Sequence, residues 1–369
     1  MSKLIQLYEE FGQSPWLDNL QRGYLTSGQL ARLRDDGIRG LTSNPTIFEK
    51  AITGSSDYDE QFKQIAAADG AVGDDYWALV TKDIEAACGV FAPVYDSSDG
   101  GDGFVSVEVA PELADDSAGT ETAARGLHET IARPNLMVKI PGTEAGLGPI
   151  RQMISEGRNI NITLIFSLER HREVMDAYLE GLEAYVQSGG SDAASVASVA
   201  SFFISRVDTE VDRRLEAIGS PEALDLRGKA AVAQGKLAYR QFQEMFAGPR
   251  WERLAAVGAR VQRPLWASTS TKNKAYPPTL YVDELIGPQT VNTLPDATID
   301  AFLEHGTLAR RVDQDVDASQ DVWDRLEAVG VHMADVAVQL EREGVASFEK
   351  SFDELLGALD AKSAELRGR

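Results

Sequence analysis

The sequence predicts an α/β protein folded as a (β/α)8 (TIM) barrel, with extra helices at the N-terminus, in the loops and at the C-terminus. Three observations carry this prediction. Eight short β-rich runs alternate with longer stretches of helical spacing, and eight parallel strands can close a barrel. Of the 369 residues, 43% are hydrophobic, which is enough for a large core. The chain is also longer than the roughly 250 residues of a bare barrel, which leaves room for added helices.

The predicted strands are short and rich in branched and aromatic residues. In chain order they cover residues 15–20 (PWLDNL), 38–44 (IRGLTSN), 103–109 (GFVSVEV), 136–140 (LMVKI), 160–166 (INITLIF), 197–206 (ASVASFFISR), 264–270 (PLWASTS) and 290–294 (TVNTL). Most are followed by a helical stretch, of which residues 168–189 are typical.

Additional helices are expected before the first strand, after the second and sixth strands, and in the tail. The tail, residues 315–369, carries Ala, Glu, Asp and Leu at helical spacing, so we expect it to pack on the barrel as part of one domain spanning residues 1–369. The sequence TIFE, from Thr46 to Glu49, has the capping-box pattern. Thr143 is placed to cap the helix after the fourth strand.

Alternation along the strands predicts which side chains enter the barrel. Successive strand residues point to opposite faces, so placing Val138 and Ile140 under the helices sends Lys139 inward, near the C-terminal end of its strand. By the same rule, Leu164 should face the helices. The other inward sets are Trp16 with Asp18; Thr42 with Asn44; Ser106 with Glu108; Asn161, Thr163 and Ile165; Ser201, Phe203 and Ser205; and Trp266, Ser268 and Ser270.

The composition argues against several classes of protein. A net charge of −22 disfavours binding to nucleic acid or to an anionic membrane, and there is no run of about 18 apolar residues. Cys88 is the single cysteine and the N-terminus lacks a signal-peptide pattern, so we expect a cytoplasmic protein. Scattered histidines and the lack of a Gly-rich phosphate motif lead us to expect no metal and no cofactor.

A polar cluster around a buried lysine suggests a specific chemistry. Barrel enzymes carry their active sites at the C-terminal ends of the strands, where these side chains gather. A buried neutral amine adds to a ketone, and the resulting imine withdraws electrons and weakens a nearby C–C bond. Carboxylates such as Asp18 and Glu108 could move the protons. The basic turn at residues 272–274 could hold a phosphate group.

These residues resemble the transaldolase family, in its long bacterial branch. The resemblance runs from about residue 4 to residue 302. The segments that carry it are GLTSNPTIFEKAI (40–52), VSVEVAP (105–111), VKIPGT (138–143), NINITLIFS (159–167) and WASTSTKN (266–273).

The resemblance implies a role for each matching residue. Lys139 would form the Schiff base, Asp18 would act as acid and base on the C4 hydroxyl, and Glu108 with Thr163 would hold a water molecule. The residues implied in substrate binding are Asn44, Asn161, Ser201, Phe203, Arg206 and Ser268. The chain departs from the family at Ser270, where many members have arginine, and we interpret Lys272 as the substitute. Ser205 also stands in place of a common glycine.

The resemblance implies transfer of a dihydroxyacetone unit from sedoheptulose 7-phosphate to glyceraldehyde 3-phosphate, which gives erythrose 4-phosphate and fructose 6-phosphate. The partners would then be small sugar phosphates, and the sequence leaves monomer and homodimer open. Two alternatives remain at this point. One is a fructose-6-phosphate aldolase that releases free dihydroxyacetone, and the other is a non-catalytic barrel that binds sugar phosphates.

Overall fold

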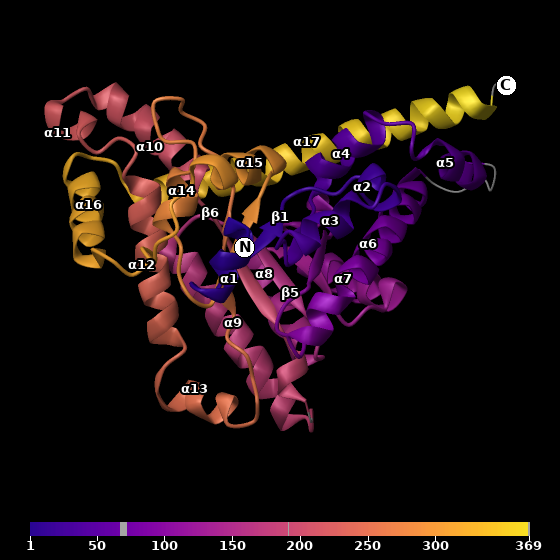
Figure 1. Cartoon of the computed structure of the whole chain (residues 1–369), viewed down its shortest axis with the longest axis horizontal. Helices are drawn as coiled ribbons and strands as arrows, with labels where there is room; N and C mark the ends of the chain where they lie inside the picture. The colour runs from indigo at the N-terminus through magenta and orange to yellow at the C-terminus, as the bar shows by residue number, and fades with distance from the viewer. Residues whose placement is uncertain (67–71, 191, 368–369) are drawn as a thin grey trace.

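The computed structural model describes residues 1–66, 72–190 and 192–367, and its centre is a closed barrel of parallel strands (Figure 1). Each strand pairs with the next in chain order, and β8 pairs with β1 to close the ring. The predicted fold is therefore confirmed. The strands are β1 (Gln13–Leu17), β2 (Gly40–Thr42), β3 (Val105–Glu108), β4 (Leu136–Pro141), β5 (Ile160–Ile165), β6 (Ser198–Phe203), β7 (Arg263–Ala267) and β8 (Thr290–Leu294).

Helices surround the strands and add to them at the predicted places. One lies before β1, several follow β2 and β6, and two form the tail. The helices are α1 (Lys3–Glu9), α2 (Arg22–Thr26), α3 (Gln29–Asp35), α4 (Pro45–Thr53), α5 (Asp59–Ala66), α6 (Val72–Ser97), α7 (Ser117–Ile131), α8 (Glu144–Ser155), α9 (Leu168–Gln187), α10 (Ser205–Ile218), α11 (Pro221–Leu224), α12 (Ala230–Met245), α13 (Gly248–Ala255), α14 (Leu280–Glu284), α15 (Asp296–His305), α16 (Val316–Ala328) and α17 (Met333–Arg367), with short 3-10 turns η1 (Pro111–Leu113) and η2 (Ala193–Ser195).

Side-chain caps fix two helix starts beside the strand ends. Thr143 caps α8 as predicted, since its Oγ1 accepts a hydrogen bond from the backbone N–H of Gly146 at 3.2 Å. The predicted capping box at Thr46 is wrong. The cap of α4 is Asn44, whose Oδ1 accepts from the N–H of Ile47 at 3.0 Å, because Pro45 already occupies the first helical position.

Strand register sets the inward residues side by side. Lys139 on β4 lies opposite Glu108 on β3 and opposite Asn161 on β5. Aligned residues on neighbouring strands point to the same face, so the predicted inward direction of all three follows from the pairing. A bond across the interior supports this arrangement: the Asn161 amide donates to Ser106 Oγ at 3.0 Å.

The end of β5 does not follow simple alternation. Leu164 has a positive φ of 60°, and the register with β6 shifts between Ile162 and Ile165. Side-chain atoms of Ile162 and Ile165 therefore lie together beside Gly142, and Leu164 reaches Gly344 of α17 at the mouth of the barrel. The prediction that Leu164 faces the helix layer and Ile165 the interior was wrong, because the bulge reverses the order.

The end of β7 also departs from prediction. Trp266 does not share a face with Ser268. Its ring packs against Phe202, which contacts His171 of α9, and its Nε1 donates to the carbonyl of Leu285, so it lies in the helix layer. The strand ends at Ala267, and a positive φ of 56° at Ser268 turns the following loop back over the barrel.

The tail helix α17 crosses the C-terminal side of the barrel, where Figure 1 draws it as the long yellow helix beside α4. Thr46 Oγ1 on α4 lies 2.8 Å from Ser351 Oγ, and the Phe352 ring packs edge-on to Tyr76 of α6 at 5.1 Å. Along the described ranges, no helix has the length and apolar character needed to cross a membrane.

Candidate active site

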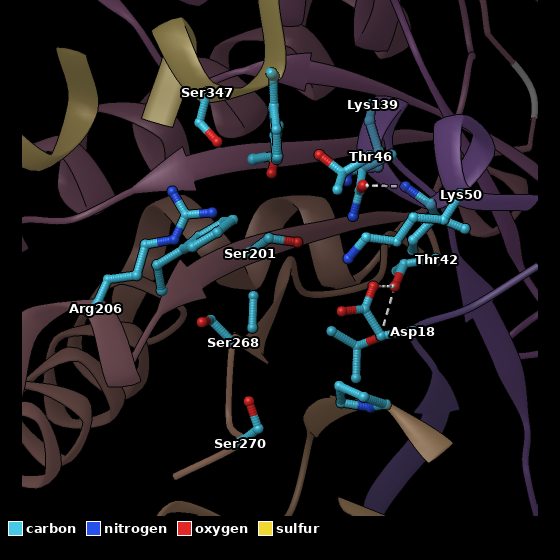
Figure 2. A pocket seen from close by; sticks show the side chains of 18 of the residues that line it. Asp18, Thr42, Thr46, Lys50, Lys139, Ser201, Arg206, Ser268, Ser270 and Ser347 are labelled. Carbon is cyan, nitrogen blue, oxygen red and sulfur yellow. Dashed lines mark hydrogen bonds between the residues drawn. The ribbon is translucent and has the colours of Figure 1, made fainter. Parts of the chain in front are cut away.

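A cavity of about 250 Å³ opens at the C-terminal ends of the strands (Figure 2). Its wall comes from βα turns, strand ends and the tail helix. The residues that line it are Asp18, Thr42, Asn44, Thr46, Ile47, Lys50, Lys139, Thr163, Ser201, Phe203, Arg206, Ala267, Ser268, Ser270, Lys272, Thr293, Pro295, Ser347 and Phe348. Most of the site residues named from the sequence thus share one cavity, although residues as far apart in the chain as Asp18 and Lys272 supply them.

Lys139 is buried at the base of this cavity. Its Nζ lies 2.9 Å from Glu108 Oε2 and donates to the carbonyl of Ser43 at 3.0 Å. The amine was expected to have apolar neighbours, but its nearest contacts are a carboxylate and a carbonyl. A proton on Lys139 has an immediate acceptor in Glu108.

Glu108 and Thr163 leave two polar atoms without partners. Glu108 Oε1 and Thr163 Oγ1 are buried and receive no hydrogen bond from any residue within the described ranges. Burial raises the pKa of Glu108, and the charge of Lys139 opposes this shift. A carboxyl group with a raised pKa can both take and return a proton near neutral pH.

Asp18 follows the end of β1 and faces Lys139 across the cavity. Thr42 Oγ1 donates to Asp18 Oδ1 at 2.8 Å and lies 2.6 Å from Thr293 Oγ1 (Figure 2). Burial raises the pKa of Asp18, while the charge of Lys139 and the Thr42 hydrogen bond lower it. Asp18 is therefore a carboxyl group suited to exchange a proton with a bound molecule.

The predicted substrate-binding amides lie at different depths. Asn161 is fully buried and does not line the cavity; its Oδ1 accepts from Ser201 Oγ at 2.7 Å, so it orients the serine that does. Asn44 lines the cavity while its Oδ1 caps α4. Its amide nitrogen has no hydrogen bond to a described residue and is free to donate.

Cationic and hydroxyl groups gather at one end of the cavity. Arg206 is the second residue of α10, and Ser268 Oγ lies 2.9 Å from Oγ of Ser205, the first. The Lys272 ammonium donates to Ser270 Oγ at 2.6 Å. Burial lowers the pKa of Arg206, and loss of hydration together with the charge of Arg206 lowers that of Lys272. Two neighbouring cations with few bonds to protein favour an anionic ligand.

Several lining residues were missed from the sequence. Thr42 was placed on the inward face but given no role, and Lys50 lies in the last turn of α4, where its position after Asn44 could have pointed to the cavity. Figure 2 shows the Lys50 side chain reaching into the cavity. Ser347 and Phe348 belong to α17, and no local pattern in the tail marks them as site residues. Nowhere in the described ranges do three or more His, Cys, Asp or Glu side chains group to hold a metal ion.

Comparisons with known proteins show the family of this chain. The family model described as transaldolase/fructose-6-phosphate aldolase matches residues 15–359. The chain is 48% identical over 361 residues to a protein named transaldolase from Parafrankia sp. (strain EAN1pec), covering 97% of this chain and 98% of that one. It is 49% identical over 356 residues to the transaldolase of Mycolicibacterium smegmatis, covering 95% and 96%. It is also 49% identical over 358 residues to that of Thermobifida fusca, covering 96% and 97%.

Proposed function

The chain belongs to the transaldolase/fructose-6-phosphate aldolase family, and we propose that it is a transaldolase that carries a dihydroxyacetone unit on Lys139. The donor would be sedoheptulose 7-phosphate and the acceptor glyceraldehyde 3-phosphate, with erythrose 4-phosphate and fructose 6-phosphate as products. One observation carries the proposal. Lys139 is buried, lies 2.9 Å from Glu108 Oε2, and lines a cavity that is also lined by Asp18 and by the cations of Arg206 and Lys272.

Imine formation begins with the loss of a proton from Lys139. Glu108 accepts this proton, because it is in contact with Nζ and its pKa is raised by burial. The neutral amine then adds to the ketone carbon, and the carbinol oxygen leaves as water. The unpartnered Glu108 Oε1 and Thr163 Oγ1 support a role in binding this water and protonating the leaving oxygen.

Cleavage of the C3–C4 bond needs a base at the C4 hydroxyl. Asp18 takes that proton, the bonding electrons move to the iminium nitrogen, and the aldehyde leaves. The three-carbon enamine stays attached to Lys139. A second aldehyde accepts the enamine carbon, Asp18 returns the proton to the new hydroxyl, and water releases the product from the lysine.

Binding groups at the two ends of the cavity would orient the sugar. Ser201, held by Asn161, and the free amide of Asn44 suit the hydroxyls of the dihydroxyacetone unit. Arg206, Ser268 and Lys272 suit the phosphate, with Phe203 beside the arginine. Binding the phosphate of both aldehydes at one place would hold each carbonyl against the same enamine carbon.

The test is a borohydride trap. Wild-type protein incubated with fructose 6-phosphate and borohydride should gain a three-carbon adduct, and peptide mapping should locate it on Lys139. Lys236 provides an internal control, because it is also buried and ion-paired, to Glu284 at 3.3 Å, but lies outside the cavity. An adduct on Lys236 instead, or full activity of Lys139→Ala, would overturn the proposal.

Measuring the release of free dihydroxyacetone separates transaldolase from aldolase. Without an acceptor aldehyde, the transaldolase should hold its three-carbon unit and release little free dihydroxyacetone. Rapid release under these conditions would favour the aldolase reaction of the same family.

A further inference from the structure

We propose that Phe348 on α17 is a positioning residue for Arg206, holding the guanidinium through its ring so that the N–H donors stay free for phosphate. The inference rests on the proposed function in taking Arg206 as a phosphate-binding residue.

Arg206 has an unusual set of contacts for an arginine in this chain. Within the described ranges, its side chain forms no hydrogen bond and no ion pair. Its guanidinium carbon lies 5.2 Å from the centre of the Phe203 ring and 6.0 Å from the centre of the Phe348 ring. Aromatic faces are therefore what hold it.

Three other described arginines also lie over rings, and each has a carboxylate as well. Arg22 lies over Tyr58 and pairs with Asp83 at 2.9 Å. Similarly, Arg39 over Tyr8 and Arg263 over Trp16 both pair with Asp102, at 2.9 and 3.4 Å. Arg206 differs from all three in having rings alone.

This difference has a chemical reason at an anion site. A carboxylate would fix the arginine through its N–H donors, and the phosphate would have to displace it. A ring attracts the cation through the face of the guanidinium and leaves the donors at its edge available. Glu343 is the acidic residue of α17 whose charge raises the pKa of Arg206, but its Oε1 is bound by the Gln339 amide at 2.8 Å and forms no ion pair with the arginine.

The backbone of α17 is shaped for this contact. A Cβ at Gly344 would lie 3.0 Å from Leu164 Cδ2 and 3.5 Å from Arg206 Nη1, so the absence of a side chain there lets the helix approach the arginine. Figure 2 shows Arg206 extending toward the side of the cavity where Ser347 lies. Phe348 follows directly and is buried.

A contact three residues further along α17 ties this part of the helix to α4. Ser351 Oγ lies 2.8 Å from Thr46 Oγ1. The phosphate end of the cavity is thus completed by a helix about 140 residues after Arg206 in sequence, and the barrel alone would leave the arginine with Phe203 as its one ring.

The experiment compares two readouts in the full-length protein. Competitive inhibition by inorganic phosphate reports on the Arg206 end, and borohydride trapping of dihydroxyacetone, which has no phosphate, reports on Lys139. Phe348→Leu should weaken phosphate inhibition roughly 10-fold, the loss of about 1.4 kcal/mol expected for a partly buried cation–π contact, and should leave dihydroxyacetone trapping unchanged. Phe348→Tyr keeps the ring and should behave as wild type.

Phe352→Leu is the matched control, since Phe352 is equally buried on the same helix and contacts Tyr76 instead. It should leave phosphate inhibition unchanged. The inference would be overturned if phosphate inhibited Phe348→Leu as strongly as wild type, or if Phe352→Leu weakened phosphate inhibition as much as Phe348→Leu does. It would also be overturned if Phe348→Leu lost dihydroxyacetone trapping to the same extent as phosphate inhibition. Arg206→Gln separates the two proposals: if it weakens phosphate inhibition and Phe348→Leu does not, the inference alone fails. If Arg206→Gln has no effect, the phosphate site of the proposed function fails as well.

Discussion

At the scale of single residues, burial and neighbouring charges decide the chemistry. Lys139 and Asp18 line the cavity and Glu108 lies against the Lys139 amine, and burial raises the pKa of both carboxyl groups while the lysine charge opposes the shift. The raised pKa brings each carboxyl group closer to neutral pH, where it can both accept and donate a proton. The sequence placed these three residues correctly, but the contact between Lys139 and Glu108 required the register of β3 and β4.

The Thr42 hydrogen bond gives a prediction about pH. Asp18 must be ionised to act as a base, and its pKa lies above the usual aspartate value, so kcat should fall as the pH drops toward that raised pKa. Thr42 Oγ1 favours the ionised form by donating to Asp18. In Thr42→Val the acid limb of kcat against pH should therefore move up by about one pH unit, the size of one charged hydrogen bond.

The control for this shift is Thr269→Val. Thr269 is also buried at the barrel mouth, but its hydroxyl donates to Asn292 Oδ1 at 2.9 Å and not to Asp18. Its acid limb should match the wild type. An unmoved limb in Thr42→Val would mean that Asp18 does not control the acid side of the reaction.

At the scale of elements, the βα turns place the site. Each strand has a site or cavity-lining residue within two residues of its C-terminal end, and helix caps and left-handed residues turn the chain there. Asn44 caps α4 and faces the cavity, while positive φ values at Leu164 and Ser268 redirect the ends of β5 and β7. Strand alternation predicts neither the register shift in β5 nor the left-handed residue Ser268 after β7, which is why Leu164, Ile165 and Trp266 were assigned to the wrong faces.

The cap of α8 provides a stability prediction. Thr143 Oγ1 accepts from the N–H of Gly146 and donates to the carbonyl of Ala114 at 2.5 Å. Thr143→Ala should lower the free energy of unfolding by roughly 1–2 kcal/mol, as removal of a helix cap does, and Thr143→Ser should keep most of it. Denaturant unfolding of the three proteins measures this. Equal stability of the alanine and threonine proteins would show that the cap contributes nothing.

At the scale of the whole molecule, the charge of the surface and the charge of the site have opposite signs. The net charge is −22, yet Lys50, Arg206 and Lys272 all line the cavity. The field of the distant acidic residues is screened within about 10 Å at 0.1 M salt, whereas a bound anion contacts the local cations directly. Local charge should therefore govern the binding of sugar phosphates.

The salt dependence of phosphate inhibition tests whether the local cations govern anion binding. Inhibition by inorganic phosphate should weaken as NaCl rises from about 0.1 M to about 1 M, because screening acts on the cationic end of the cavity. Lys272→Gln should bind phosphate more weakly at low salt and respond less to added salt. Lys274→Gln is the control, since Lys274 lies in the same turn but does not line the cavity. If Lys272→Gln and Lys274→Gln responded equally to salt, Lys272 would not be a phosphate-binding residue.

The tail shows the limit of local reasoning. Helical spacing in residues 315–369 predicted helices, and the structure forms α16 and α17 there. That Ser347 and Phe348 would line the cavity was not predictable, because it depends on the path of α17 over α4 and α10.

The sequence by itself determined the strand order, the barrel and the inward direction of Lys139, because alternation and turn residues are local properties of the chain. It also identified four charged groups of the cavity, Asp18, Lys139, Arg206 and Lys272, but not Lys50. The tertiary structure alone decided how those groups meet: Lys139 against Glu108, Asn161 beneath Ser201, and the rings of Phe203 and Phe348 around Arg206. Register, bulges and the path of the tail helix set these contacts, and each depends on residues far apart in the chain.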